Sequence, residues 1–182
     1  SSDLPAFHAL NRNKISIRVD IKTDEGLALI RDLVKVSDVV SDNFSPGVMD
    51  RAGLGYDDLI KIKPDIICIS LSGVGQYGPL KDATLYANTI MALSGLSSLI
   101  GYKDEPLLGM SAVAYGDANA SIHAAFIILA ALFHRKMTGE GQRIDLAEAQ
   151  MGSSLMGEAL MDYYMNGRVA GPQGNRHPHM AP

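Results

Sequence analysis

The sequence has 182 residues, of which 47% are hydrophobic and 20% are charged, and its formal net charge is −4. This length suits one globular domain with a real core, and the composition is too even for a disordered or low-complexity chain. The slightly acidic charge, with no basic stripe longer than short pairs, argues against a nucleic-acid surface.

The first half of the chain alternates between strand and helix patterns. A period-two alternation at 15–20 predicts a strand, and Thr23 before Asp24 and Glu25 predicts the start of an amphipathic helix. The Ile-rich run at 65–71 predicts a strand buried on both faces, which is typical of a parallel sheet beneath helices. Between these elements we expect a strand from 39 to 44 and short helices at 48–52 and 56–61.

The second half begins with a glycine-rich polar loop at 72–84. Further helices are expected at 85–94, from Asp117 to about Met137, and at 147–166, with a strand at 142–146 and a Gly-, Pro- and His-rich tail at 167–182. The fold class predicted is α/β, with a Rossmann-like open, mainly parallel sheet and flanking helices. Residues 1–166 are assigned to this domain and 167–182 to a linker.

The cellular setting follows from what the chain lacks. Its one cysteine, Cys68, permits neither an internal disulfide nor a cysteine-based zinc site, and its apolar surroundings predict a buried thiol. The longest apolar run, 124–133, is too short to span a bilayer, and the first residues lack the basic and apolar regions of a signal peptide. We therefore expect a cytoplasmic protein with no membrane contact and no bound metal.

Asp117 is the most informative side chain, and its neighbourhood permits two roles. It lies just before the longest apolar run, where an aspartate commonly caps a helix and the helix dipole favours a negative charge. The same position would suit a nucleophile, because free backbone N–H groups there can stabilise an oxyanion. No G-x-S-x-G motif is present and Cys68 has no obvious partner histidine, so Asp117 is the best candidate nucleophile.

Two further patterns suggest other chemistry. The segment 73–78 reads G-x-G-x-x-G after a predicted strand, as in dinucleotide-binding proteins, but Pro79 and a polar loop follow where a helix should begin. This leaves a nucleotide-binding oxidoreductase as an alternative function. His177 and His179 could form a metal pair, although loop packing or substrate contact suits them better.

Several spaced motifs occur together in one order: Asn43-Phe44-Ser45-Pro46-Gly47, Leu54-Gly55-Tyr56, Ser72-Gly73, Gly78-Pro79, Ala92-Leu93-Ser94-Gly95, Gly116-Asp117 and Thr138-Gly139-Glu140-Gly141-Gln142. With them the chain resembles the family III CoA-transferases, the family of formyl-CoA:oxalate and carnitine CoA-transferases, over nearly its full length. The resemblance implies that the protein moves CoA from an acyl-CoA to a free carboxylic acid. It also implies that Asp117 is the nucleophile, through an aspartyl anhydride and an aspartyl-CoA thioester.

The resemblance also implies the ligand contacts and the partners. The residues that match CoA-contacting motifs are Asn43, Phe44, Arg51 and Tyr86, with Lys14 as a weaker candidate. CoA and acyl-CoA are substrates in this family, and no permanently bound cofactor is expected. The partner expected is a second copy of the chain, because two subunits of this family interlock like links of a chain.

The chain departs from the family pattern in two respects. Ala87 follows Tyr86 where many members have an acidic residue, so a side chain that assists some relatives is absent. The family also contains α-methylacyl-CoA racemases, whose catalytic histidine falls at Tyr86; a phenol is a poor base at neutral pH, so the racemase is an alternative ranked below the transferase. Family members are longer at both ends, which predicts that this chain is part of the large domain of a longer protein.

Overall fold

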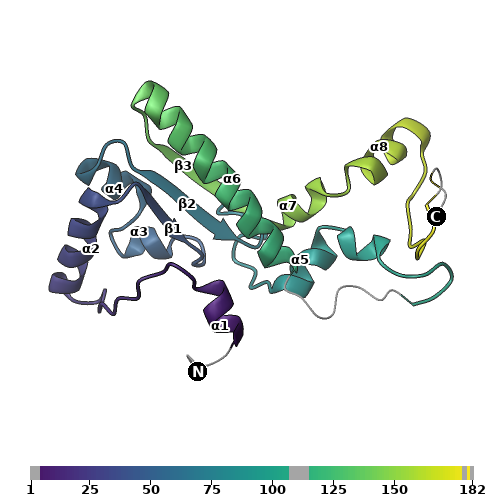
Figure 1. Ribbon diagram of the computed structural model, residues 1–182, viewed down its shortest axis with the longest axis horizontal. Coiled ribbons are helices and arrows are strands. Elements are labelled where there is room, and N and C mark those ends of the chain that lie inside the picture. Colours follow the sequence, from purple (N-terminus) through teal and green to yellow (C-terminus); the bar gives the residue numbers. More distant parts are fainter. Residues whose placement is uncertain (1–4, 107–114, 178–179, 181–182) are drawn as a thin grey trace.

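The computed structural model describes residues 5–106, 115–177 and 180 (Figure 1). His179, one of the two histidines considered for a metal pair, lies outside the described residues. The described elements, in chain order, are α1 (Pro5–Leu10), α2 (Asp24–Val36), β1 (Val39–Asp42), α3 (Val48–Arg51), α4 (Tyr56–Ile62), β2 (Ile67–Ser72), α5 (Ala87–Leu93), the 3-10 helix η1 (Leu96–Leu99), α6 (Tyr115–Thr138), β3 (Gln142–Ala147), α7 (Glu148–Ser154) and α8 (Gly157–Asn166).

The three strands form one open, fully parallel sheet in the order β1-β2-β3. Val39 is paired with Ile67, and Ile67 in turn with Gln142, so all three strands start at the same edge. A parallel pair needs a crossover between its strands, and here α3 and α4 lie between β1 and β2, while α5 and α6 lie between β2 and β3. The predicted α/β class with a parallel sheet and flanking helices is confirmed.

The central strand β2 is buried on both faces because neighbouring side chains of a strand point to opposite sides. Cys68 joins a cluster with Val34 and Leu59, from the side of α2 and α4. The next residue, Ile69, packs on the other face against Ala120 and other side chains from α6 and β3. Ile69 is fully buried and Cys68 is 8% exposed, so the buried thiol and the two-sided strand predicted from the sequence are both confirmed.

The predicted start of α2 is also confirmed. The Thr23 hydroxyl accepts a hydrogen bond from the backbone N–H of Gly26 at 3.1 Å and donates to the carbonyl of Asp20 at 2.9 Å. Gly26 has to lack a side chain, because a Cβ there would collide with the Asp20 carbonyl oxygen. The cap therefore fixes both the helix and the direction from which the chain enters it.

The strand predicted at 15–20 is wrong. These residues are described, but they form no strand, and Ile15 is 94% exposed. An alternating pattern makes a strand only where a neighbouring strand supplies its hydrogen bonds, and the described sheet has β1 at that edge.

The single helix predicted at 147–166 is also wrong, because it is broken into α7 and α8. The break follows two serines whose hydroxyls bond to helix carbonyls, Ser153 to Ala149 at 3.0 Å and Ser154 to Met151 at 2.7 Å. Such bonds compete with the helical ladder, and Gly157, a poor helix former, then opens α8.

Helix α6 is the longest element, with 24 residues, and it crosses one face of the sheet (Figure 1). Its residues facing the core are small, among them Ala120, Ala124 and Ala131, so the helix lies close to the strands. The opposite side carries an exposed apolar stripe of Ile122, Phe126, Leu129, Phe133 and Met137. By length and composition alone α6 could cross a membrane, unlike the shorter run considered in the sequence, although part of it is buried as a core helix is.

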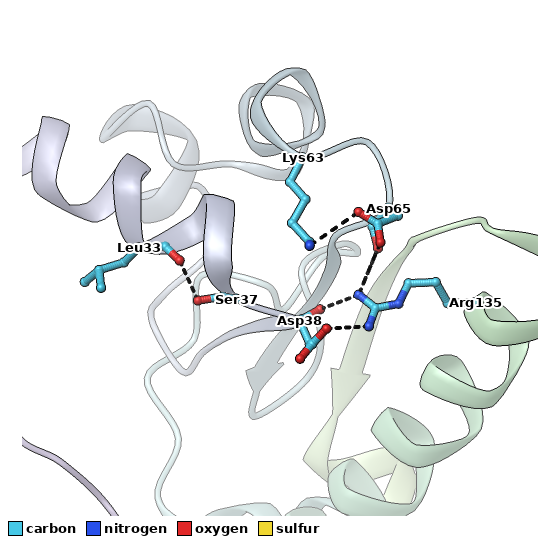
Figure 2. A network of polar contacts seen from close by, with 6 residues as sticks. All are labelled: Leu33, Ser37, Asp38, Lys63, Asp65 and Arg135. Carbon is cyan, nitrogen blue, oxygen red and sulfur yellow. Dashed lines mark hydrogen bonds and ion pairs between the residues drawn. The ribbon is translucent and has the colours of Figure 1, made fainter.

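A polar network ties the end of α6 to the starts of β1 and β2 (Figure 2). The Arg135 guanidinium donates to the Asp38 carboxylate at 2.6 Å and to the backbone carbonyls of Asp38 and Asp65 at 3.2 and 3.4 Å. Asp65 in turn lies 3.6 Å from Lys63. The hydrogen bond and charge of Arg135 lower the pKa of Asp38. The network therefore holds the amino edge of the sheet together and leaves the carboxyl edge free of it.

Candidate active site

The candidate site lies at the carboxyl edge of the parallel sheet. Residues that follow β1, β2 and β3 meet there, and the start of α6 faces the same edge because this helix runs antiparallel to the strands (Figure 1). Ligands of open α/β sheets commonly bind outside the carboxyl ends of the strands. The sequence therefore brings chemistry from distant segments to one place.

An open cavity of about 400 Å³ occupies this edge. Its volume lies within the usual range for small-molecule sites. Four of the six side chains predicted to form a site line it: Asn43, Phe44, Tyr86 and Asp117. Both aromatic rings are available to a ligand, since Phe44 is 48% and Tyr86 is 75% exposed.

Asp117 lies in the first turn of α6, with an exposed side chain. The described helix begins at Tyr115, two residues earlier than expected, so Asp117 is inside the helix and is not its cap. The preceding Gly116 is buried where α6 approaches α5, and a Cβ there would meet the Ala87 carbonyl at 3.3 Å. The glycine thus lets α6 start beside α5, and the dipole of α6 favours the negative charge of the following aspartate.

The turn carrying Asn43 and Phe44 is held in place by Asp42, the last residue of β1. One Asp42 carboxylate oxygen accepts the Phe44 backbone N–H at 3.1 Å, and the other accepts the Ser70 hydroxyl of β2 at 2.8 Å. The carboxylate therefore ties the turn to the neighbouring strand and fixes the direction in which the chain leaves β1.

The remaining two predicted contacts lie outside the cavity lining. Lys14 is exposed, and its ammonium donates to the Asn11 side chain at 3.2 Å. Arg51 is exposed on α3 and folds back over Gly47, where a Cβ would meet its guanidinium at 2.9 Å. Their proposed contacts with CoA stay predictions.

Sequence reasoning missed Glu148, which lines the same cavity at the start of α7. The pKa of Glu148 is raised, first by burial and then by the negative charge of the nearby Asp117. Its Oε2 atom is buried and has no hydrogen-bond partner among the described residues, as is also true of the Ser72 hydroxyl in the same cavity. The signal in the sequence was only partial, because Glu148 lies two residues after the strand predicted at 142–146 and its proximity to Asp117 is a tertiary contact.

Lys81 was missed as well, because the loop that contains it has no regular pattern. It is exposed and lines the cavity beside Asp82. It supplies a positive charge near the two aromatic rings.

The glycine-rich segment at 73–78 does not have the geometry of a dinucleotide-binding loop. No helix follows it until α5 begins at Ala87, whereas that motif places its third glycine in a helix. Both Gly75 and Gly78 have positive φ angles, of 89° and 93°. The backbone N–H of Gln76 donates to both oxygens of the Asp145 carboxylate, at 3.1 and 2.9 Å, so it is not free for a phosphate.

Comparison with known proteins agrees with this geometry. Residues 2–182 match CoA-transferase family III. The chain belongs to this family. Its relatives include the succinate–glutarate CoA-transferase of Agrobacterium fabrum, 38% identical over 97% of the chain and 44% of the relative, and the acetyl-CoA:oxalate CoA-transferase of Acetobacter aceti, 36% identical over 97% and 45%.

The fold of this family III chain is also found in solved structures. A CaiB/BaiF family protein from Brucella suis superimposes with a TM-score of 0.90 at 37% identity, over 97% of the chain and 46% of that protein. The chain spans less than half the length of the curated relatives named above. The family motifs have local structural reasons: Gly116 allows contact with α5, and Gly95, with φ of 87°, ends that helix.

Proposed function

We propose that the protein is a CoA-transferase that moves CoA from an acyl-CoA thioester to a free carboxylic acid, with Asp117 as the nucleophile. The observation that carries this proposal is the exposed Asp117 carboxylate in the first turn of α6, lining one cavity with Asn43, Phe44 and Tyr86. Family membership supports the reaction class, and the proposal covers the whole protein.

The chemistry needs two covalent steps on Asp117. Its carboxylate attacks the thioester carbonyl, the C–S bond breaks, and CoA leaves as a thiolate while a mixed anhydride forms. The thiolate then attacks the aspartyl carbonyl and releases the donor acid as a carboxylate, which leaves CoA bound to Asp117 as a thioester. The acceptor carboxylate reverses both steps. Each addition creates an oxyanion, so positive dipoles near Asp117 favour it.

The cavity supplies groups suited to the ends of CoA. Phe44 and Tyr86 offer flat apolar faces against which an adenine ring could stack, and Lys81 offers a cation for a phosphate. The two relatives described above are named for the small dicarboxylates succinate, glutarate and oxalate, so these are the first acceptors to test.

We extend the proposal to assembly and location. The exposed apolar stripe on α6 supports a homodimer, which family resemblance expects to be interlocked. Residues 167–182 would then lead from this large domain toward a further domain, and the single buried cysteine suits a reducing cytoplasm.

The decisive experiment traps the covalent intermediate. The whole protein is incubated with an acyl-CoA and treated with hydroxylamine or borohydride, and the peptide containing Asp117 is analysed by mass spectrometry. We expect modification at Asp117, and a loss of roughly three orders of magnitude or more in kcat for Asp117→Asn. Asp24→Asn is the matched control, because Asp24 lies in the first turn of α2 outside the cavity lining.

The alternatives give different outcomes. Exchange of the substrate α-proton with solvent, without an adduct on Asp117, would support a racemase. A thermal shift with NAD and none with CoA would support the nucleotide-binding alternative. Full activity of Asp117→Asn would show that this aspartate has only a structural role in the first turn of α6.

A further inference from the structure

Two carboxyl groups from separate elements meet in the candidate site. Asp117 comes from the first turn of α6, and Glu148 opens α7 directly after β3. Both line the same cavity, and α6 and α7 pack against each other near the start of α6 (Figure 1). Two negative charges in one partly buried cavity repel each other, so a single proton shared by the pair is favoured.

The surroundings decide which group holds that proton. Asp117 is exposed to solvent, whereas Glu148 is half-buried and its Oε2 atom is shielded from water. A carboxylate loses solvation energy on burial, and a neutral carboxyl group loses much less. Burial is also the largest cause of the raised pKa of Glu148. If the two carboxyl groups share one proton, burial therefore favours its place on Glu148.

The other charged and titratable groups lining the cavity do not alter this assignment. They are Lys81, Asp82 and Tyr86, from the segment before α5, and all three side chains are exposed. Among the charges, Asp117 is the one that acts on the pKa of Glu148.

We propose that Glu148 is a positioning residue, whose protonated carboxyl group donates a hydrogen bond to the Asp117 carboxylate and holds it for attack on the thioester. This inference rests on the proposed function of Asp117. One oxygen of Asp117 accepts the bond and the other stays free to attack. Once Asp117 is acylated, the same donor lies next to its carbonyl oxygen, where negative charge develops when the CoA thiolate adds. Glu148 keeps its proton throughout.

The test compares Glu148→Gln and Glu148→Ala in the whole protein, with Glu158→Gln as the matched control. Glu158 also lies in the first turn of a helix, α8, but is exposed and outside the cavity lining. The kinetic constants kcat and KM for CoA transfer are measured between about pH 5 and pH 9. Thermal melting checks that each variant folds.

The expected pattern differs from that of a structural residue. Wild type and Glu158→Gln lose kcat on the alkaline side as Glu148 ionises. Glu148→Gln, whose amide donates at every pH, keeps kcat within about threefold in acid and lacks the alkaline loss. Glu148→Ala lowers kcat by roughly 10–100-fold with little change in KM. Wild-type behaviour in Glu148→Ala, or an unchanged alkaline loss in Glu148→Gln, would overturn the inference.

A second measurement separates this inference from the proposed function. Carbon-13 NMR of the side-chain carboxyl groups follows Glu148 in wild type and in Asp117→Asn without any substrate. We expect a pKa above the usual glutamate range in wild type and a fall toward that range in Asp117→Asn. Titration of wild-type Glu148 in the usual range would refute the shared proton even if Asp117 is trapped as an adduct. A raised pKa of Glu148 without any adduct on Asp117 would support the carboxyl pair but refute the proposed CoA-transfer mechanism.

Discussion

Gly152 is the position where a single methyl group should disturb the candidate site from outside it. This glycine is buried in α7, where the helix approaches Ser94 at the end of α5. An alanine Cβ at this position would lie 2.7 Å from the Ser94 Cβ and 2.8 Å from its hydroxyl oxygen. The serine has little freedom to move, because its hydroxyl donates to the Met91 carbonyl at 2.8 Å.

The size of the effect follows from these contacts. Carbon atoms pack at about 3.5–4.0 Å, so α5 and α7 must separate by roughly 1 Å. Such overpacking costs about 3 kcal/mol at the upper end of the usual range, and the higher helix propensity of alanine returns about 1 kcal/mol. A net loss of about 2 kcal/mol should lower the Tm of a domain of this length by roughly 4–8 °C. Because α7 begins at Glu148, kcat should fall as well.

The assay is thermal unfolding followed by circular dichroism, with Gly152→Ala and Gly157→Ala in parallel. Gly157 lies at the start of α8, and no atom of the described residues lies within 4 Å of its added Cβ, so its alanine variant should keep or raise Tm. The reasoning is refuted if Gly152→Ala melts at or above the wild-type temperature.

Two further predictions concern ionisable groups away from the cavity lining. Burial raises the pKa of the Cys68 thiol to about 11. At pH 8 the folded protein should therefore react with a thiol reagent at least about 100-fold more slowly than the protein in denaturant. Equal reaction rates would contradict the burial of Cys68 in β2. Arg135→Gln should lower the urea midpoint at neutral pH, because Arg135 lowers the pKa of Asp38 in the folded state. The stabilisation from the lowered pKa of Asp38 is fully present above the usual aspartate pKa and is lost as the pH falls through the lowered pKa. The difference in urea midpoint between Arg135→Gln and wild type should therefore narrow in acid. A difference that stays constant with pH would exclude Asp38 as its source. Arg168→Gln, which removes an exposed ion pair with Asp162, is the control and should have little effect.

The sequence predicted those parts of the fold that depend on local patterns. The Ile-rich run of β2 and the Thr23 cap of α2 carry their signals within a few residues, and both predictions are confirmed. The strand at 15–20 was mispredicted because alternation reveals nothing about the presence of a neighbouring strand. The division of the helix at 147–166 depends on the hydroxyls of Ser153 and Ser154, which a hydrophobic pattern ignores.

The site was predicted unevenly for a related reason. Asp117 was found from its position and by elimination, and Asn43, Phe44 and Tyr86 through the family resemblance; the cavity brings all four together. Glu148 was missed because its importance arises only when the start of α6 lies next to the end of β3. That proximity is a tertiary contact, and no spacing within the sequence predicts it.

The topology of the sheet has a consequence for folding kinetics. β1 pairs with β2 across 28 residues, from 39 to 67, whereas β2 pairs with β3 across 75, from 67 to 142. Closing the longer loop costs more chain entropy, so we expect β3 to join last. Until then one edge of β2 offers unpaired backbone groups to other chains, which makes this interval the one most open to aggregation. Because Glu148 directly follows β3, the pair it forms with Asp117 would be completed only in that final step.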